Sequence, residues 1–217
     1  SGHGQQIQDD NGDEPDGYDE ALIPYDADGV YDPVTYTGQN HLRDDELQVK
    51  LDLIRSRIGQ RGSLVIVIDA CHSGTATRSN EFSICRGEPK PFQKPGYKPV
   101  ASKSMHDMAG PRDGFAENSG NGFSNMIVFS ASSPNQVNYE TKDAANNGVG
   151  SLSYAFARAL SDLPAGSDYS LLFQKIKAMI QADFPTQLPM IEGDMSQEVF
   201  SGNFVKRDEA IFINSII

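Results

Sequence analysis

The stretch Leu64-Val65-Ile66-Val67-Ile68-Asp69-Ala70-Cys71-His72-Ser73-Gly74 decides the fold of this chain. Its apolar, largely β-branched opening predicts a fully buried strand of the kind found in parallel sheets. The apolar run stops at Asp69, and small polar turn residues follow Cys71. A lone cysteine is most often a buried core residue, but open α/β sheets carry their functional sites at strand ends of this kind. The position of Cys71 therefore favours a site.

The segments around this strand predict an α/β layer arrangement. Apolar residues recur every three to four positions between Asp44 and Ile58, which predicts an amphipathic helix that ends at Gly59. The other expected elements are a strand, two helices and a short strand, over residues 126–131, 151–163, 168–184 and 188–191. We therefore expect one domain, with a mainly parallel sheet flanked by helices on both faces.

Composition limits the classes of partner. The 217 residues include 30 acids and 18 bases, for a net charge of −12, which disfavours nucleic acid as a ligand. No apolar run approaches the ~18 residues of a membrane helix, so no membrane partner is expected. The expected location is the cytoplasm. Cys71 and Cys85 could form one disulfide, but we interpret both as free thiols because a chain of this size does not depend on one.

Charge is unevenly distributed along the chain. Residues 1–46 hold thirteen acids and one base, Arg43. Crowded carboxylates are typical either of a solvated acidic loop or of a site for a hard cation such as calcium, and both interpretations stay open here. Residues 78–122 hold seven of the 18 bases together with five prolines, which predicts a long exposed loop that is sensitive to proteases.

A nucleophilic thiol needs a base, and histidine is the natural partner at neutral pH. His72 follows Cys71 directly, and side chains of neighbours along a turn usually point apart, so His72 is interpreted as structural. His3 lies between Gly2 and Gly4, which leave it conformational freedom and little crowding. The pair of Cys71 and His3 predicts a Cys/His hydrolase.

The chain resembles the metacaspases and the bacterial caspase-like cysteine peptidases. The resemblance extends from residue 1 to about 204, and leaves 205–217 as a C-terminal extension. It rests on ordered motifs, chiefly Ser1-Gly2-His3-Gly4, Asp16-Gly17-Tyr18-Asp19-Glu20, Asp44-Asp45-Glu46-Leu47, Asp69-Ala70-Cys71-His72-Ser73-Gly74, Ser130-Ala131-Ser132 and Gln187-Leu188-Pro189. It implies a caspase-like three-layer α/β fold.

The resemblance also implies a mechanism that needs no cofactor. Cys71 would attack the scissile carbonyl, His3 would protonate the leaving amine, and the backbone N–H groups of Cys71 and Gly4 would hold the oxyanion. Asp69 and Ser1 match positions of an acidic S1 pocket. A buried carboxylate there selects Arg or Lys at P1, so protein or peptide substrates with basic P1 residues are expected.

Calcium activation is a further implication of the resemblance. The matching acids are Asp19, Asp44 and Asp45, while Arg78 stands where some members carry a fourth acid. Arg78 and the basic loop behind it are also expected to contain an autoprocessing site.

Two further expectations concern the whole chain. The family's first strands precede the histidine motif and are not in this sequence, so pairing with a missing N-terminal fragment is expected. The alternative function is that of a catalytically inactive caspase-like scaffold that binds basic partners through its acidic surface.

Overall fold

The computed structural model describes residues 1–12, 14, 16–71, 84–99, 122–133 and 136–201. Its elements are, in chain order, β1 (His3–Gln8), β2 (Tyr18–Ile23), β3 (Leu42–Arg43), α1 (Asp44–Ile58), β4 (Ser63–Ile68), β5 (Asn125–Ser130), β6 (Glu140–Lys142), β7 (Gly148–Gly150), α2 (Ser151–Ser161), α3 (Tyr169–Asp183) and β8 (Met190–Glu192). This mixture of helices and strands confirms the expected α/β class. Arg78, His72 and the extension 205–217 lie outside the described residues.

The central sheet has the strand order β4-β5-β8. β4 and β5 run parallel, with Ser63 opposite Asn125 and Ile68 opposite Ser130, whereas β8 is antiparallel to β5. In the described sheet the two six-residue strands are parallel, as expected, and the three-residue strand β8 adds an antiparallel edge. The reason lies in the connection between β5 and β8, which contains two helices. One crossover helix would return the chain to the start of β5, and the second helix carries it back again.

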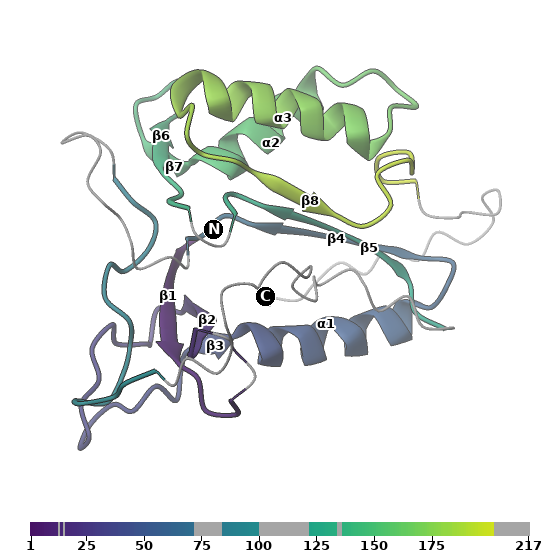
Figure 1. Ribbon diagram of the computed structural model, residues 1–217. Helices are drawn as coiled ribbons and strands as arrows, with labels where there is room; N and C mark the ends of the chain where they lie inside the picture. Colours follow the sequence, from purple (N-terminus) through teal and green to yellow (C-terminus); the bar gives the residue numbers. More distant parts are fainter. Residues whose placement is uncertain (13, 15, 72–83, 100–121, 134–135, 202–217) are drawn as a thin grey trace.

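Alternate residues of β5 face opposite sides of this sheet, as strand geometry requires. Met126 and Val128 pack with Leu51 of α1, while Ile127 and Phe129 pack against α2 and α3. α1 lies on one side of the sheet, and α2 and α3 lie on the other (Figure 1). The three-layer arrangement expected for the chain is therefore present.

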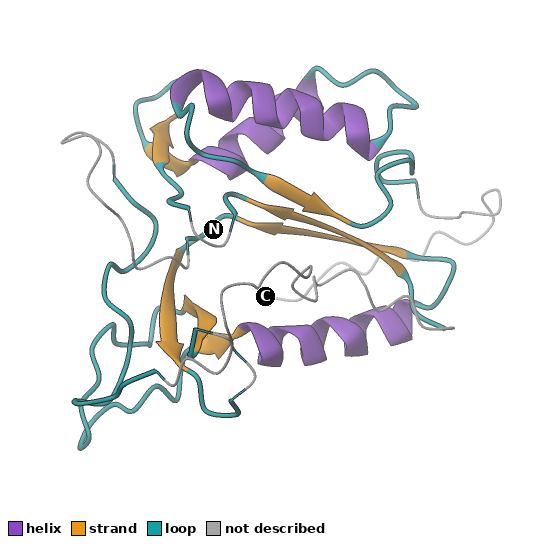
Figure 2. Ribbon diagram, viewed as in Figure 1, coloured by secondary structure: helices purple, strands orange, loops and turns teal. Residues whose placement is uncertain are grey.

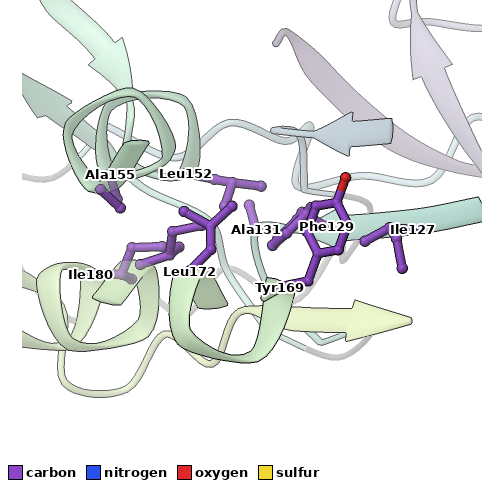
Figure 3. Close-up of a cluster of buried hydrophobic side chains, with 10 residues drawn as sticks. Ile127, Phe129, Ala131, Leu152, Ala155, Tyr169, Leu172 and Ile180 are labelled. Carbon is purple, nitrogen blue, oxygen red and sulfur yellow. The ribbon is translucent and has the colours of Figure 1, made fainter. Parts of the chain in front are cut away.

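The larger core fills the space between β5 and the helix pair α2–α3. Ile127, Phe129 and Ala131 meet side chains from both helices, among them Leu152 and Leu172 (Figure 3). Each fully buried large apolar side chain contributes about 1.5–3 kcal/mol to folding. This packing holds β5, and through it β4, in place, and so fixes where the β4 strand ends.

A second sheet, with the strand order β1-β2-β3, stands apart from the central one (Figure 2). Its strands are antiparallel, and its buried cluster consists of Ile7, Ala21, Tyr36 and Phe92. The N–H of Gly2 donates to the carbonyl of Asp69 at 3.1 Å. The start of β1 is thereby joined to the residues that follow β4.

No helix in the described ranges is both long enough and apolar enough to cross a membrane.

Candidate active site

Cys71 lies three residues beyond the end of β4, and its side chain is fully buried. Its thiol donates a hydrogen bond to the carbonyl oxygen of Gln136, with 3.2 Å between Sγ and the oxygen. Asp69 and Ala70 beside it are also buried. The sequence places the cysteine here because β4 ends at Ile68; all six residues of this strand are half-buried, and not fully buried as the apolar run had predicted.

His3 opens β1, and its side chain is exposed. Its neighbours on both sides are bonded to the Cys71 region. Gly2 donates to the carbonyl of Asp69, as described above, and Gly4 donates to the carbonyl of Arg86 at 3.2 Å. The two parts of the expected dyad, which are 68 positions apart in sequence, are thus brought to the same end of the central sheet.

The carbonyl oxygen of Arg86 accepts two backbone hydrogen bonds. One comes from the N–H of Gly4 at 3.2 Å and the other from the N–H of Cys71 at 3.1 Å. Gly4 and Cys71 carry the two N–H groups expected from the sequence to hold an oxyanion. Two preorganised N–H donors that converge on one oxygen are the arrangement that stabilises developing negative charge in acyl transfer.

Asp69 is held in a fixed orientation by its hydrogen bonds. One carboxylate oxygen accepts from Asn138 Nδ2 at 2.8 Å, and the other accepts from the backbone N–H of Ser153 at 2.7 Å, near the start of α2. Asn138 in turn accepts from Gln187 Nε2 at 3.0 Å, within a buried amide network. The motif Gln187-Leu188-Pro189 therefore has a structural role, because the Gln187 amide holds Asn138, which in turn orients Asp69.

The guanidinium group of Arg86 lies beside this carboxylate. Its Nη1 donates to Ser1 Oγ at 3.0 Å. A Cβ added to Gly150 would collide with Asp69 Oδ2 and would lie 2.7 Å from Arg86 Nη1, so both groups lie in space that a side chain at position 150 would fill. The expected pocket residues Ser1 and Asp69 thus surround a basic side chain that comes from the chain itself.

Sequence reasoning missed Glu140 and Arg86. Glu140 Oε1 lies 3.8 Å from Arg86 Nη2, and adds a second acid to the group around the guanidinium. No motif marks Glu140, because it opens the short strand β6 in a polar loop. In the sequence, Arg86 is marked by its position before a glycine within the loop 78–122, which was expected to contain an autoprocessing site.

Cys85 lies against Cys71 and differs from the expected nucleophile in its chemistry. A hydrogen bond with Cys71, together with burial, raises the pKa of the Cys85 thiol above its usual value. Cys85 therefore stays protonated at neutral pH and is a poor nucleophile. Both cysteines are free thiols, as interpreted from the sequence.

The acids expected to bind calcium fall into two neighbouring clusters. Asp19 groups with Asp9 and Asp10, and Asp44 groups with Glu14 and Glu20. In each cluster the possible ligand atoms lie within 4.8 Å of one another. Among the described residues, the trio of Asp19, Asp44 and Asp45 is not brought together as one ligand group.

Asp19 fits a metal poorly, because its buried carboxylate is paired with the guanidinium of Arg43. Arg43 also lies 3.3 Å from Asp10. Asp45 accepts a hydrogen bond from Asn11 Nδ2 at 3.0 Å. The carboxylates of Glu14, Glu20 and Asp44 lie close enough together to share a hard cation such as calcium, which takes several oxygen ligands at short range.

Comparisons with known proteins show the family and the fold of the chain. A family model described as a caspase domain matches residues 1–201. Metacaspase-1 of Eremothecium gossypii is 28% identical over 220 residues, which cover 88% of this chain and 45% of that protein. Metacaspase III c of Phaeodactylum tricornutum is 42% identical over 76 residues, which cover 35% of this chain and 19% of that protein.

A solved structure shares the fold. The crystal structure of a Geobacter sulfurreducens protein matches with a TM-score of 0.52 and 21% identity, and the match covers 93% of this chain and 69% of that one. Two metacaspases each match 88% of this chain, and the chain spans about half of their length.

Proposed function

Because this chain belongs to the caspase-domain family of cysteine-type peptidases, we propose that it is an endopeptidase that cuts after Arg or Lys. One observation carries the proposal. A single arginine has its carbonyl at the paired N–H groups of Gly4 and Cys71 and its guanidinium beside Ser1, Asp69 and Glu140. An oxyanion-binding site and an acidic pocket at this spacing suit a substrate with a basic P1 residue.

The proposed reaction begins with the thiolate of Cys71, which attacks the carbonyl carbon of the P1 residue. The negative charge that develops on the oxygen is held by the N–H groups of Gly4 and Cys71. His3 gives a proton to the leaving nitrogen as the C–N bond breaks, and a thioester remains. His3 then takes a proton from water, the hydroxide adds to the thioester, and the Cys71 thiolate departs.

The acidic surroundings explain the basic preference. A guanidinium or ammonium group loses its hydration on entering a pocket, and carboxylates can compensate for that loss. Asp69 is well placed for this because its own hydrogen bonds hold it rigidly. An Asp side chain at P1 would meet Asp69 and Glu140 with like charge, so such substrates should be rejected.

Regulation by calcium and by autoprocessing belongs to the same proposal. The carboxylates of Glu14, Glu20 and Asp44 support a calcium site near the start of α1, and Arg43 already neutralises Asp19. β4 forms an outer edge of the sheet in the described ranges, which supports pairing with strands from another segment there.

The test compares fluorogenic peptides with Arg or Asp at P1, using the wild-type protein and Cys71→Ala, each with calcium or with a chelator. Cleavage of only the Arg peptide, and only by the wild-type protein, is the expected result. Loss of that cleavage in the presence of chelator, and its recovery when calcium is added, would support the calcium proposal. Equal cleavage rates with calcium and with chelator would contradict it. Equal cleavage of both peptides would contradict the pocket assignment, and no cleavage at all would favour the scaffold function.

A further inference from the structure

The only two cysteines of the chain lie in contact with each other. Cys85 comes 14 positions after Cys71 in sequence, and a hydrogen bond joins the two thiols. A thiol has one proton to donate, and that of Cys71 is directed at the carbonyl oxygen of Gln136. The hydrogen bond between the thiols therefore runs from Cys85 to the sulfur of Cys71. Both thiols are free, so the two sulfur atoms meet without a covalent bond.

The backbone holds the Cys85 segment against Cys71. The N–H of Cys71 donates to the carbonyl of Arg86, the residue after Cys85, at 3.1 Å. Side chains two positions apart in an extended segment face the same side, so residues 85 and 87 share a face. A Cβ added to Gly87 would lie 3.2 Å from the Cys71 Cβ. The Cys85 side chain is therefore on the side where Cys71 lies, as a disulfide between them requires.

Cys85 is also fixed by the loop that leads into β6. It forms an antiparallel bridge with Tyr139. The N–H of Arg86 donates to the carbonyl of Asn138 at 3.0 Å. The carbonyl of the residue before Cys85 accepts from the N–H of Glu140 at 2.9 Å. Since the backbone is bonded on both sides of Cys85, the contact between the two thiols is a property of the fold.

The two thiols differ in the way that a redox pair requires. In such a pair a reactive thiolate is oxidised first, and a neighbouring cysteine then resolves the product into a disulfide. Cys71 is the expected nucleophile, whereas a hydrogen bond with Cys71, burial and the charge of Cys71 raise the pKa of the Cys85 thiol. Oxidation of Cys71 to a neutral sulfenic acid removes that charge. The pKa of Cys85 therefore falls at the step in which its sulfur must attack.

We propose that a peroxide converts Cys71 and Cys85 into a disulfide, and that this reversible bond inactivates the peptidase. The loss of activity rests on the proposed function, in which Cys71 is the nucleophile, but the bond itself does not. The Cys71 thiolate attacks one peroxide oxygen, the O–O bond breaks, and hydroxide leaves and takes up a proton. The Cys85 sulfur then attacks the sulfenic sulfur, and the hydroxyl group leaves as water with the Cys85 proton. The two sulfurs together lose two electrons, which the peroxide gains.

The first test detects the bond without an assay of activity. Reduced and desalted protein is treated with hydrogen peroxide, and the remaining thiols are then alkylated. The wild-type protein should lose both reactive thiols and form no disulfide-linked dimer on a non-reducing gel. Because Arg78 lies between the two cysteines in sequence, trypsin should release two linked peptides that mass spectrometry finds separated only after reduction.

The second test measures the reversibility of inactivation. In dithiothreitol, Cys85→Ser should cleave an Arg-P1 peptide at the wild-type rate, because Cys85 takes no part in the proposed reaction. After excess peroxide, the wild-type protein should regain its activity in dithiothreitol and Cys85→Ser should not. The reason is that an unresolved sulfenic acid is oxidised further to a sulfinic acid, which thiols do not reduce. Ile84→Ala, at an exposed neighbour, is the matched control and should recover like the wild-type protein.

The outcomes separate this inference from the proposed function. If the reduced protein cleaves Arg peptides but peroxide forms no bond between Cys71 and Cys85, the inference is wrong and the proposed function stands. Recovery of Cys85→Ser to the same extent as the wild-type protein would also overturn the inference alone. A disulfide that forms and leaves the cleavage rate unchanged would contradict Cys71 as the nucleophile, and would overturn both. If the reduced protein cleaves no peptide, the proposed function itself is wrong, and inactivation by the disulfide is wrong with it.

Discussion

Asp69 links a backbone contact of the fold to the proposed specificity pocket. Its backbone carbonyl accepts the Gly2 N–H, which attaches the start of β1 to the end of β4. Its side chain, held by Asn138 and by the N–H of Ser153, faces the position of the Arg86 guanidinium. The two roles use different atoms of Asp69, so a substitution that keeps the shape of the side chain can separate them.

Asp69→Asn should reduce kcat/KM for an Arg-P1 peptide by about 30-fold or more, since loss of one partner of a buried charge pair costs about 2 kcal/mol or more. The free energy of unfolding should also fall, by about 1–3 kcal/mol, because the Asn amide nitrogen cannot accept one of the two buried hydrogen bonds that the carboxylate accepts. Steady-state kinetics and denaturation measure the two effects. Asp162→Asn, at an exposed acid, is the control. An unchanged preference for Arg over other P1 residues would show that Asp69 is not a pocket residue.

Arg43 supplies the counter-charge for the buried Asp19. Replacement of Arg43 by Met should lower the free energy of unfolding by about 3 kcal/mol, because it leaves a buried carboxylate without its partner. The double variant Arg43→Met/Asp19→Asn should recover much of this loss. Urea unfolding of the four proteins in the cycle measures the coupling. A double variant no more stable than Arg43→Met alone would contradict the pairing.

At the scale of elements, strong periodic patterns were predictable and short polar ones were not. The helix expected over Asp44–Ile58 is confirmed with the same bounds, and the strands expected near 64–69 and 126–131 are confirmed within one residue. β1 was not predicted, because Gln-Gln-Ile-Gln has one apolar residue and is stabilised by partners distant in sequence. The internal occupant at Arg86 was not predictable for the same reason, since three separate segments bind it.

A buried histidine, His41, orients the Gln5 side chain that binds β1 to the segment after Arg86. His41 Nε2 donates to Gln5 Oε1 at 3.1 Å, and its Nδ1 accepts from the Tyr36 hydroxyl at 3.0 Å. Gln5 Nε2 in turn donates to the carbonyl of Lys90 at 2.7 Å. The neutral imidazole makes both of its bonds in this arrangement, and burial lowers the pKa of His41.

The histidine predicts a pH dependence of stability. Because the pKa is lower in the folded than in the unfolded state, the unfolded chain takes up the proton first, and stability falls as the pH drops below the unfolded value of about 6.5. The contribution of His41 between pH 7 and 5.5 should be up to about 1 kcal/mol. Urea unfolding at both pH values, compared with His41→Gln, measures it. The same pH slope in both proteins would contradict this account.

At the scale of the whole molecule, the loop 78–122, which is proposed to contain an autoprocessing site, falls between the two strands that form the parallel pair. β4 belongs to the part before Arg86, and β5 belongs to the part after Gly87. These strands pair over six residue positions, and side chains from both contribute to the cores on the two faces of the sheet. Autoprocessing in this loop would therefore leave the core undivided.

We accordingly expect the two fragments produced by autoprocessing within residues 78–122 to stay together. They should elute as one particle in size-exclusion chromatography, and should separate only on a denaturing gel. The Cys71→Ala protein, which remains one chain, is the reference for the elution volume. Fragments that elute separately in buffer would mean that the sheet does not survive the cut.

The central claim is that Cys71 is the nucleophile of a site that accepts a basic P1 residue. The most direct measurement is covalent labelling by a peptide acyloxymethyl ketone with Arg at P1, followed by location of the adduct by mass spectrometry. We predict one label per chain, on Cys71 and not on Cys85, and far slower labelling by the matched reagent with Asp at P1. A label on Cys85, or equal rates with the two reagents, would contradict the account.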